Sequence, residues 1–142
     1  MQKALLLLVG GITGAVLTWT ALAQDPVLKS LPFSTSREAG DTLYLSGQIP
    51  RTSDGEEVRE SAAAETKQAM ENLGAILTEK GYTWSDVVNV TVYLNDLEDY
   101  AEMNKAYAAF FDGPFPARAC IGGVEIAFGH RVEISAIAYK AN

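Results

Sequence analysis

The sequence has little cysteine, little histidine and no cluster of positive charge. Its 142 residues include one cysteine, Cys120, and one histidine, His130. A single cysteine excludes an intrachain disulfide. One histidine, with no ligand spacing among the acidic residues, argues against a metal centre. The net charge of −7 disfavours nucleic acid as a partner, because no basic cluster offsets it. The sequence also lacks the G-x-S-x-G, P-loop and dinucleotide-binding motifs, which argues against those classes of enzyme.

The N-terminus has the pattern of an export signal. Lys3 is followed by an apolar run and then by Ala21-Leu22-Ala23. A basic start, an apolar stretch and small residues two apart predict a signal peptide over residues 1–23, cleaved after Ala23. We therefore expect an exported protein, in a bacterium a periplasmic one, with no membrane attachment after cleavage. The apolar run is about 20 residues long, enough to cross a bilayer, so a retained anchor is the alternative.

The rest of the chain predicts one domain. Residues 24–39 contain prolines, serines and threonines and predict an extended leader, and residues 40–142 predict an α+β domain. The periodicity indicates strands near 41–47, 86–94, 117–122 and 131–140, and helices over 60–80 and after 96, with a further short strand an option near 48–51. This order predicts a mixed β-sheet with two helices packed on one face.

Alternation within the strands predicts one buried face and one mixed face. Two sets of apolar residues predict the core: Val88, Val90, Val92 and Leu94, and then Val132, Ile134, Ala136 and Ala138. The other face combines tyrosines, small polar groups and few charges: Tyr44, Ser46, Asn89, Thr91, Tyr93, Arg118, Cys120, Glu133, Ser135, Ile137 and Tyr139. This composition is typical of an interface, so we expect a second subunit to cover the mixed face. A solvent-exposed sheet face is the alternative.

Two pairs of residues offer chemistry. Cys120 and His130 flank one loop and form the only conceivable nucleophile–base pair, although a lone cysteine in an apolar strand is more often a buried hydrophobe. We expect His130 itself to be solvated. Arg118 and Glu133 are both predicted on the mixed face. A guanidinium binds a carboxylate through two parallel hydrogen bonds, and a glutamate can orient or deprotonate water. A simple cross-strand ion pair is the alternative.

Several segments resemble the RidA (YjgF-type) family of reactive-intermediate deaminases. They include Ser46-Gly47-Gln48-Ile49-Pro50, Pro116-Ala117-Arg118-Ala119-Cys120 and Val132-Glu133-Ile134, and the match runs from about residue 31 to the C-terminus. The resemblance implies a chorismate-mutase-like fold and a homotrimer with sites between subunits. It also implies hydrolysis of small 2-imino acids, or their enamine tautomers, to 2-oxo acids and ammonia, without metal or organic cofactor.

The same resemblance assigns roles to individual residues. Arg118 would grip the substrate carboxylate, Glu133 would orient the attacking water, and the backbone at Cys120 would help to hold that water or the imine nitrogen. Three further residues would line the cleft: Ser46, Gly47 and Asn104.

The sequence departs from the family pattern at two places. Phe33 stands where the family often has a tyrosine, so it would close the pocket without offering a hydroxyl. In the 121–130 loop, Ile126-Ala127 replaces the usual Leu-Pro, which leaves the substrate preference open. A non-catalytic small-molecule-binding or protein-protecting trimer that retains the cleft is therefore the alternative function.

Overall fold

The computed structural model describes residues 31–141. The predicted signal peptide and most of the predicted leader lie outside the described residues. The described part contains five strands and two α-helices: β1 Ser36–Ala39, β2 Thr42–Gln48, α1 Ala62–Glu79, β3 Val87–Leu94, α2 Tyr100–Ala108, β4 Ala117–Gly122 and β5 Val132–Tyr139.

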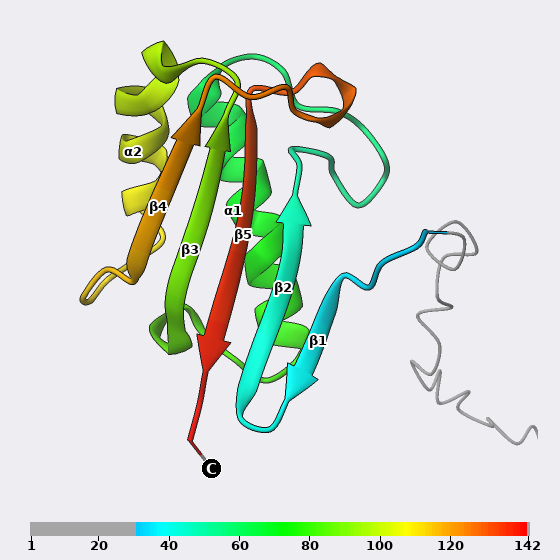
Figure 1. Ribbon diagram of the computed structural model, residues 1–142, viewed down its shortest axis with the longest axis vertical. Helices are drawn as coiled ribbons and strands as arrows, with labels where there is room; N and C mark the ends of the chain where they lie inside the picture. The colour runs from blue at the N-terminus through cyan, green and yellow to red at the C-terminus, as the bar shows by residue number, and fades with distance from the viewer. Residues whose placement is uncertain (1–30, 142) are drawn as a thin grey trace, which may run out of the picture. The chain divides into compact units, whose positions relative to one another are not determined.

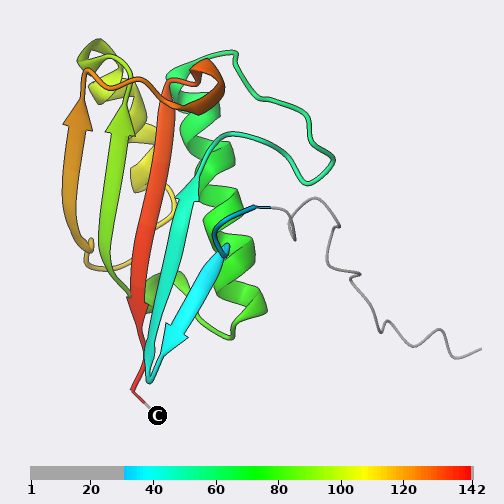
Figure 2. The ribbon, with the colours of Figure 1, turned by 45° about the vertical axis from the view of Figure 1, so that its right-hand side comes forward.

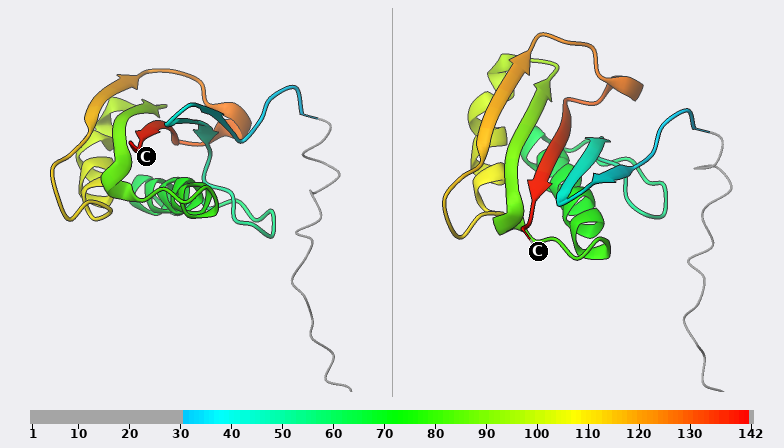
Figure 3. Two further views of the ribbon diagram at one scale, coloured as in Figure 1. Left: turned by 90° about the horizontal axis from the view of Figure 1, so that it is seen from below. Right: turned by 60° about the horizontal axis from the view of Figure 1, so that its bottom comes forward.

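The five strands form one mixed sheet in the order β1-β2-β5-β3-β4 (Figure 1). β3 and β4 are parallel, whereas the other neighbouring strands are antiparallel. Parallel neighbours need a crossover connection, and α2 supplies it between β3 and β4. Both helices lie on the same side of the sheet (Figures 2 and 3). The predicted fold class is therefore confirmed.

Local hydrogen bonds mark where α1 begins and where the turn that leads into α2 begins. The Ser61 side chain caps α1 by accepting a hydrogen bond from the backbone N–H of Ala64 at 3.1 Å. The Asp96 carboxylate accepts from the N–H of Glu98 at 2.9 Å and begins a short 3-10 turn that leads into α2.

The second helix is short. It ends at Ala108, so Phe110 and Phe111 lie beyond it. Both rings pack edge-on against Trp84, with centroids 5.5 and 5.4 Å apart.

The edge of the sheet differs from the prediction. Residues 36–39, inside the predicted leader, form β1, which joins β2 through a tight turn at Gly40 with φ of 59°. The optional strand near 48–51 does not form, since Arg51 makes only an isolated bridge with Glu57. Short polar segments such as Ser36–Ala39 carry little alternation, so sequence periodicity does not reveal them.

The helix-covered face forms the core almost as predicted. The β5 residues Val132, Ile134, Ala136 and Ala138 are buried, and so are Val90, Val92 and Leu94 of β3. The prediction for Val88 is wrong, because its side chain is 46% exposed while Val87 is buried. A register shift between Val87 and Asn89 breaks the alternation at the start of β3.

The opposite face of the sheet has no helix over it within the described chain (Figure 3). Tyr44 and Tyr139 on this face are each 49% exposed. Within residues 31–141, no helix has the length and apolar character needed to cross a membrane.

Candidate functional site

Arg118 lies on the helix-covered side of the sheet. In the parallel pairing of β3 with β4, Arg118 is opposite Val90 and Cys120 is opposite Val92, and both valines point into the core. The prediction that Arg118 and Cys120 share the mixed face is therefore wrong. Alternation shows which residues of one strand share a side, but only the pairing shows which side of the sheet that is.

Side chains from α2 hold the Arg118 guanidinium. Its Nη2 donates to Oδ1 of Asn104 at 2.7 Å, and its Cζ lies 4.7 Å from the centre of the Tyr107 ring. The Tyr100 hydroxyl accepts a longer contact of 3.4 Å. Arg118 makes no ion pair with a carboxylate of the described residues. We call Arg118, Asn104 and Tyr107 the Arg118 half-site.

A cavity of about 330 Å³ opens beside this half-site, lined by Asn104, Tyr107, Ala108, Phe115, Pro116 and Arg118. The Tyr107 side chain is buried, and its hydroxyl has no hydrogen-bond partner in the described part of the chain. Burial raises the pKa of Tyr107, and the nearby Arg118 lowers it by a smaller amount. Tyr107 is a site residue that was not predicted from the sequence. The signal was its position one helical turn after Asn104, on the same side of α2.

Glu133 points from the other side of the sheet. It is opposite Tyr93 in the pairing of β5 with β3 and lies beside Gly47 of β2. A Cβ atom on Gly47 would lie 1.9 Å from Oε1 of Glu133, so only glycine leaves room for this carboxylate. These two residues help to line a cavity of about 390 Å³ with Tyr93, Val124, Glu125, Ile126 and Ser135.

The segment before β1 lies on the same side of the sheet as Glu133. The Ser46 hydroxyl donates to the carbonyl of Ser34, and the Ser46 N–H donates to the carbonyl of Thr35 at 3.0 Å. Phe33 comes directly before this anchored segment, and its side chain is 57% exposed. We call Ser46, Gly47, Glu133 and the adjoining cavity the Glu133 half-site.

The two half-sites lie on opposite faces of one sheet. β3 also separates β4, which carries Arg118, from β5, which carries Glu133. The alternative prediction of a cross-strand ion pair between Arg118 and Glu133 within one chain is therefore wrong. One chain alone also cannot present both groups to one small substrate.

Cys120 and His130 are not brought together either. Cys120 packs against the core from β4, and burial raises the pKa of its thiol, which disfavours the nucleophilic thiolate. His130 is buried between Glu57 and Glu65, so the prediction that it is solvated is wrong. Among the described residues, no group of three or more histidine, cysteine or acidic side chains has a metal-binding arrangement.

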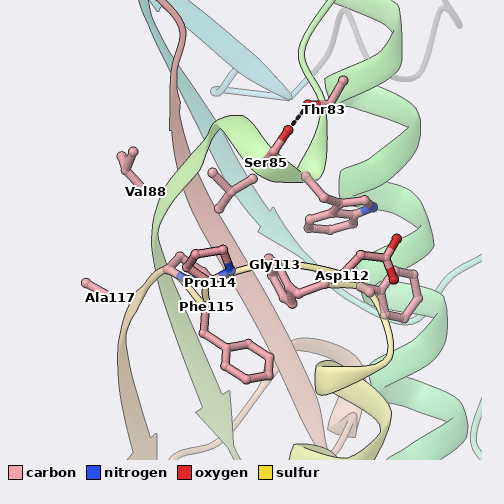
Figure 4. A pocket seen from close by; sticks show the side chains of 13 residues that line it. Thr83, Ser85, Val88, Asp112, Gly113, Pro114, Phe115 and Ala117 are labelled. Carbon is pink, nitrogen blue, oxygen red and sulfur yellow. Dashed lines mark hydrogen bonds between the residues drawn. The ribbon is translucent and has the colours of Figure 1, made fainter.

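A third cavity, of about 650 Å³, lies between the turn at Trp84 and the segment 110–117 (Figure 4). Phe110, Phe111 and Phe115 contribute much of its lining. It contains none of the predicted site residues, although Phe115 and Pro116 border both this cavity and the one beside Arg118.

Comparison with known proteins identifies the family. The model of the family described as Endoribonuclease L-PSP matches residues 25–140. A mouse protein named 2-iminobutanoate/2-iminopropanoate deaminase is 40% identical over 110 residues, covering 77% of this chain and 82% of the mouse protein. The chain therefore belongs to the Endoribonuclease L-PSP family, which is the RidA (YjgF-type) family that its motifs resemble.

Solved structures show the same fold. RidA from an Antarctic Psychrobacter species is 35% identical with a TM-score of 0.74, and the match covers 78% of this chain and 90% of that protein. Escherichia coli TdcF, solved with bound serine, is 29% identical with a TM-score of 0.75 and similar coverage of 78% and 90%.

Proposed function

We propose that this protein is a cofactor-independent deaminase that hydrolyses small 2-imino acids or their enamine tautomers. The observation that carries the proposal is the Arg118 guanidinium, held by Asn104 at 2.7 Å and stacked on Tyr107, with no carboxylate of the described chain paired to it. Such a preorganised fork suits a substrate carboxylate. The mouse relative named as an imine deaminase supports the choice of reaction.

The proposed reaction needs only one placed water molecule. Water oxygen adds to the electrophilic imine carbon, while Glu133 accepts a water proton and passes it to the nitrogen. This gives a carbinolamine. Its hydroxyl proton then passes through Glu133 to the nitrogen as the carbon–nitrogen bond breaks and the carbonyl forms, so that a 2-oxo acid and ammonia leave. The backbone at Cys120 would help to hold the water or the nitrogen. Fixing the carboxylate and the water supplies rate enhancement through orientation.

We further propose that each site forms between two copies of the chain. Arg118 and Glu133 face opposite sides of the sheet, so one copy would supply the Arg118 half-site and its neighbour the Glu133 half-site. Contact between two different surfaces is head-to-tail, and such contacts form a ring when the rotation between neighbours closes. A homotrimer, which the family resemblance implies, is the ring that we propose, with the mixed sheet face covered in it.

Mixing two inactive variants tests both parts of the proposal. Arg118→Ala and Glu133→Gln are each expected to lose imine hydrolysis, followed as 2-oxo acid formed from 2-aminoacrylate or iminobutyrate generated in situ. After unfolding and refolding together at equal amounts, about one quarter of the sites would combine an intact Arg118 with an intact Glu133. Recovery of activity near that fraction supports a shared site, whereas no recovery overturns it.

The same assay separates the reaction from the alternative function. A binding trimer without catalysis would retain a carboxylate ligand, lose it in Arg118→Ala, and turn over no imine. TdcF, solved with bound serine, shows that a relative holds a small ligand with an amino and a carboxylate group. The net charge of −7 argues against RNA as the substrate.

We propose that the protein is exported and matures at Gln24, on the basis of the N-terminal pattern. The intact mass of the protein recovered from its native compartment tests this directly. A chain that retains Met1 or Lys3 would support the membrane anchor instead.

A further inference from the structure

His130 is buried without a partner. Only 1% of the residue is exposed, and neither ring nitrogen has a hydrogen-bond partner among the described residues. Nδ1 lies 3.8 Å from Oε2 of Glu65, and Nε2 lies 3.9 Å from Oε1 of Glu57. Both separations are too long for hydrogen bonds. A buried polar ring left without partners normally destabilises a fold, so this position calls for a physical explanation.

Two carboxylates and two guanidinium groups surround the ring. Glu57 binds Arg51 at 2.7 Å and also pairs with Arg59, and Glu65 is itself only 1% exposed. The formal charges of these four groups cancel, so burial dominates. Burial lowers the pKa of His130 below its ordinary value of 6.5, and Arg59 acts in the same direction. The imidazole is therefore neutral at neutral pH.

The same groups fasten the segment between β4 and β5, residues 123–131, which we call the β4–β5 loop. Oε2 of Glu65 accepts a hydrogen bond from the backbone N–H of Arg131 at 2.7 Å. Arg59 donates to the carbonyls of Phe128 and Gly129 at 2.8 and 3.2 Å. The loop is thereby tied to the start of α1 and to the segment before it.

This loop also forms a wall of the Glu133 half-site. Its residues Val124, Glu125 and Ile126 line the cavity that contains Glu133. Its last residue, Arg131, directly precedes the first residue of β5 and lies two positions before Glu133. A change in how the loop is fastened therefore changes the surroundings of the Glu133 carboxylate.

We propose that Glu65 and His130 are positioning residues that hold the β4–β5 loop closed over the Glu133 half-site, and that acid releases the loop. In the closed loop the imidazole stays neutral. When the loop lifts, the ring reaches water and takes up a proton near its ordinary pKa of 6.5. Protons therefore bind preferentially to the lifted state, and acidification shifts the population toward it. The catalytic consequence rests on the proposed function, but the loop movement itself does not.

Hydrogen exchange of the full mature protein measures the loop directly and needs no substrate. After correction for intrinsic exchange, protection of the loop amides is expected to fall about tenfold from about pH 7.5 to about pH 5.5 in the wild type. His130→Gln keeps a neutral polar side chain of similar size but cannot be protonated, so its protection is expected to stay level. Equal pH profiles in the two proteins would overturn the proposal.

A second variant keeps the proposal testable if His130→Gln folds poorly. Glu65→Gln keeps an oxygen for the Arg131 N–H but removes the charge that favours protonated His130. Its closed loop should take up protons less readily than the wild type, so the acid-driven loss of protection should extend to lower pH. A loss identical to that of the wild type counts against the role of Glu65. Arg118→Ala, in the other half-site, serves as the control and should match the wild-type profile.

Kinetics give a second readout. Loss of the closed loop lowers the fraction of protein competent to bind, so acidification should raise KM by the factor by which the closed fraction, taken from hydrogen exchange, falls, with a smaller change in kcat. His130→Gln should remove that rise. If no imine is turned over but the exchange profiles differ as expected, the proposed function fails and the loop mechanism stands.

Discussion

The Arg118 half-site and the Glu133 half-site differ in how they are built. The Arg118 half-site rests on regular elements, because α2 and β4 supply Arg118, Asn104 and Tyr107. The Glu133 half-site combines a strand residue with a bulge at Gly47 and with a loop fastened by buried charges. A rigid support holds the Arg118 guanidinium in position to bind a carboxylate. In the Glu133 half-site, by contrast, pH and the sequence of the loop can change the surroundings of the catalytic carboxylate. Substitutions at four positions break or sharpen this contrast.

Arg118→Ala should have the largest effect. Loss of the guanidinium removes the anchor proposed for the substrate carboxylate, which lowers kcat/KM for imine hydrolysis about a thousandfold, or about 4 kcal/mol. Steady-state assays of 2-oxo acid formation measure this. Lys67→Ala, which removes an exposed positive charge from α1, is the control and should keep wild-type activity. Equal losses in both variants would contradict a specific role for Arg118.

Gly47→Ala should come next, because the new Cβ would lie 1.9 Å from Oε1 of Glu133. The carboxylate must move, and displacing a reacting group by about 1 Å lowers kcat about a hundredfold. Gly113→Ala places a Cβ with no atom within 4 Å and is the matched control. If Gly47→Ala retains full kcat, the closeness of Gly47 to Glu133 has no catalytic importance.

Tyr107 should have a smaller effect that depends on the ring rather than the hydroxyl. Tyr107→Leu removes the aromatic face under the guanidinium and should raise KM about fivefold. Tyr107→Phe removes only a hydroxyl without a partner in the described chain, so the free energy of unfolding should change by less than about 1 kcal/mol. Urea unfolding and KM measurements on both variants separate the two contributions. A large loss of stability in Tyr107→Phe would show that the hydroxyl has a partner.

Glu57→Gln should give the smallest effect, a loss of stability that is present at neutral pH and disappears in acid. Hydrogen bonds from Arg51, and then from Arg59, lower the pKa of Glu57 from 4.5 to about 2. A carboxyl group with a depressed pKa stabilises the fold above its unfolded value, and this stabilisation is lost as the pH falls from 4.5 toward 2. The variant should therefore show a flatter decline of urea-unfolding free energy over that range. An unchanged decline would mean that these ion pairs contribute nothing to acid stability.

The sequence predicted the fold class and most of the elements because the buried faces of β3, β5 and α1 have regular apolar periods. It did not reveal β1, a short polar strand whose partner lies within a single hairpin. It also placed Val88 in the core, because a shift in register leaves no mark on the order of residues.

Prediction of the site was limited in a different way. The roles of Arg118 and Glu133 came from motif resemblance and remain predictions. Their assignment to one face failed because the direction in which a strand presents its residues depends on its neighbour, and β4 is parallel to β3. The burial of His130 could not be predicted from the sequence either, because the groups around it come from segments more than 60 positions earlier.

Strand β3 has a consequence for the assembly as a whole. Val92 faces the side that carries Arg118, and the next residue, Tyr93, lines the cavity that contains Glu133. In the proposed ring, each copy of β3 therefore separates two different sites instead of serving one. A shift of β3 on occupation of one site would reach the other site through the same strand, so the three sites need not bind independently. Cooperativity, read as a Hill coefficient that departs from one, would be a property of the single-layer sheet itself.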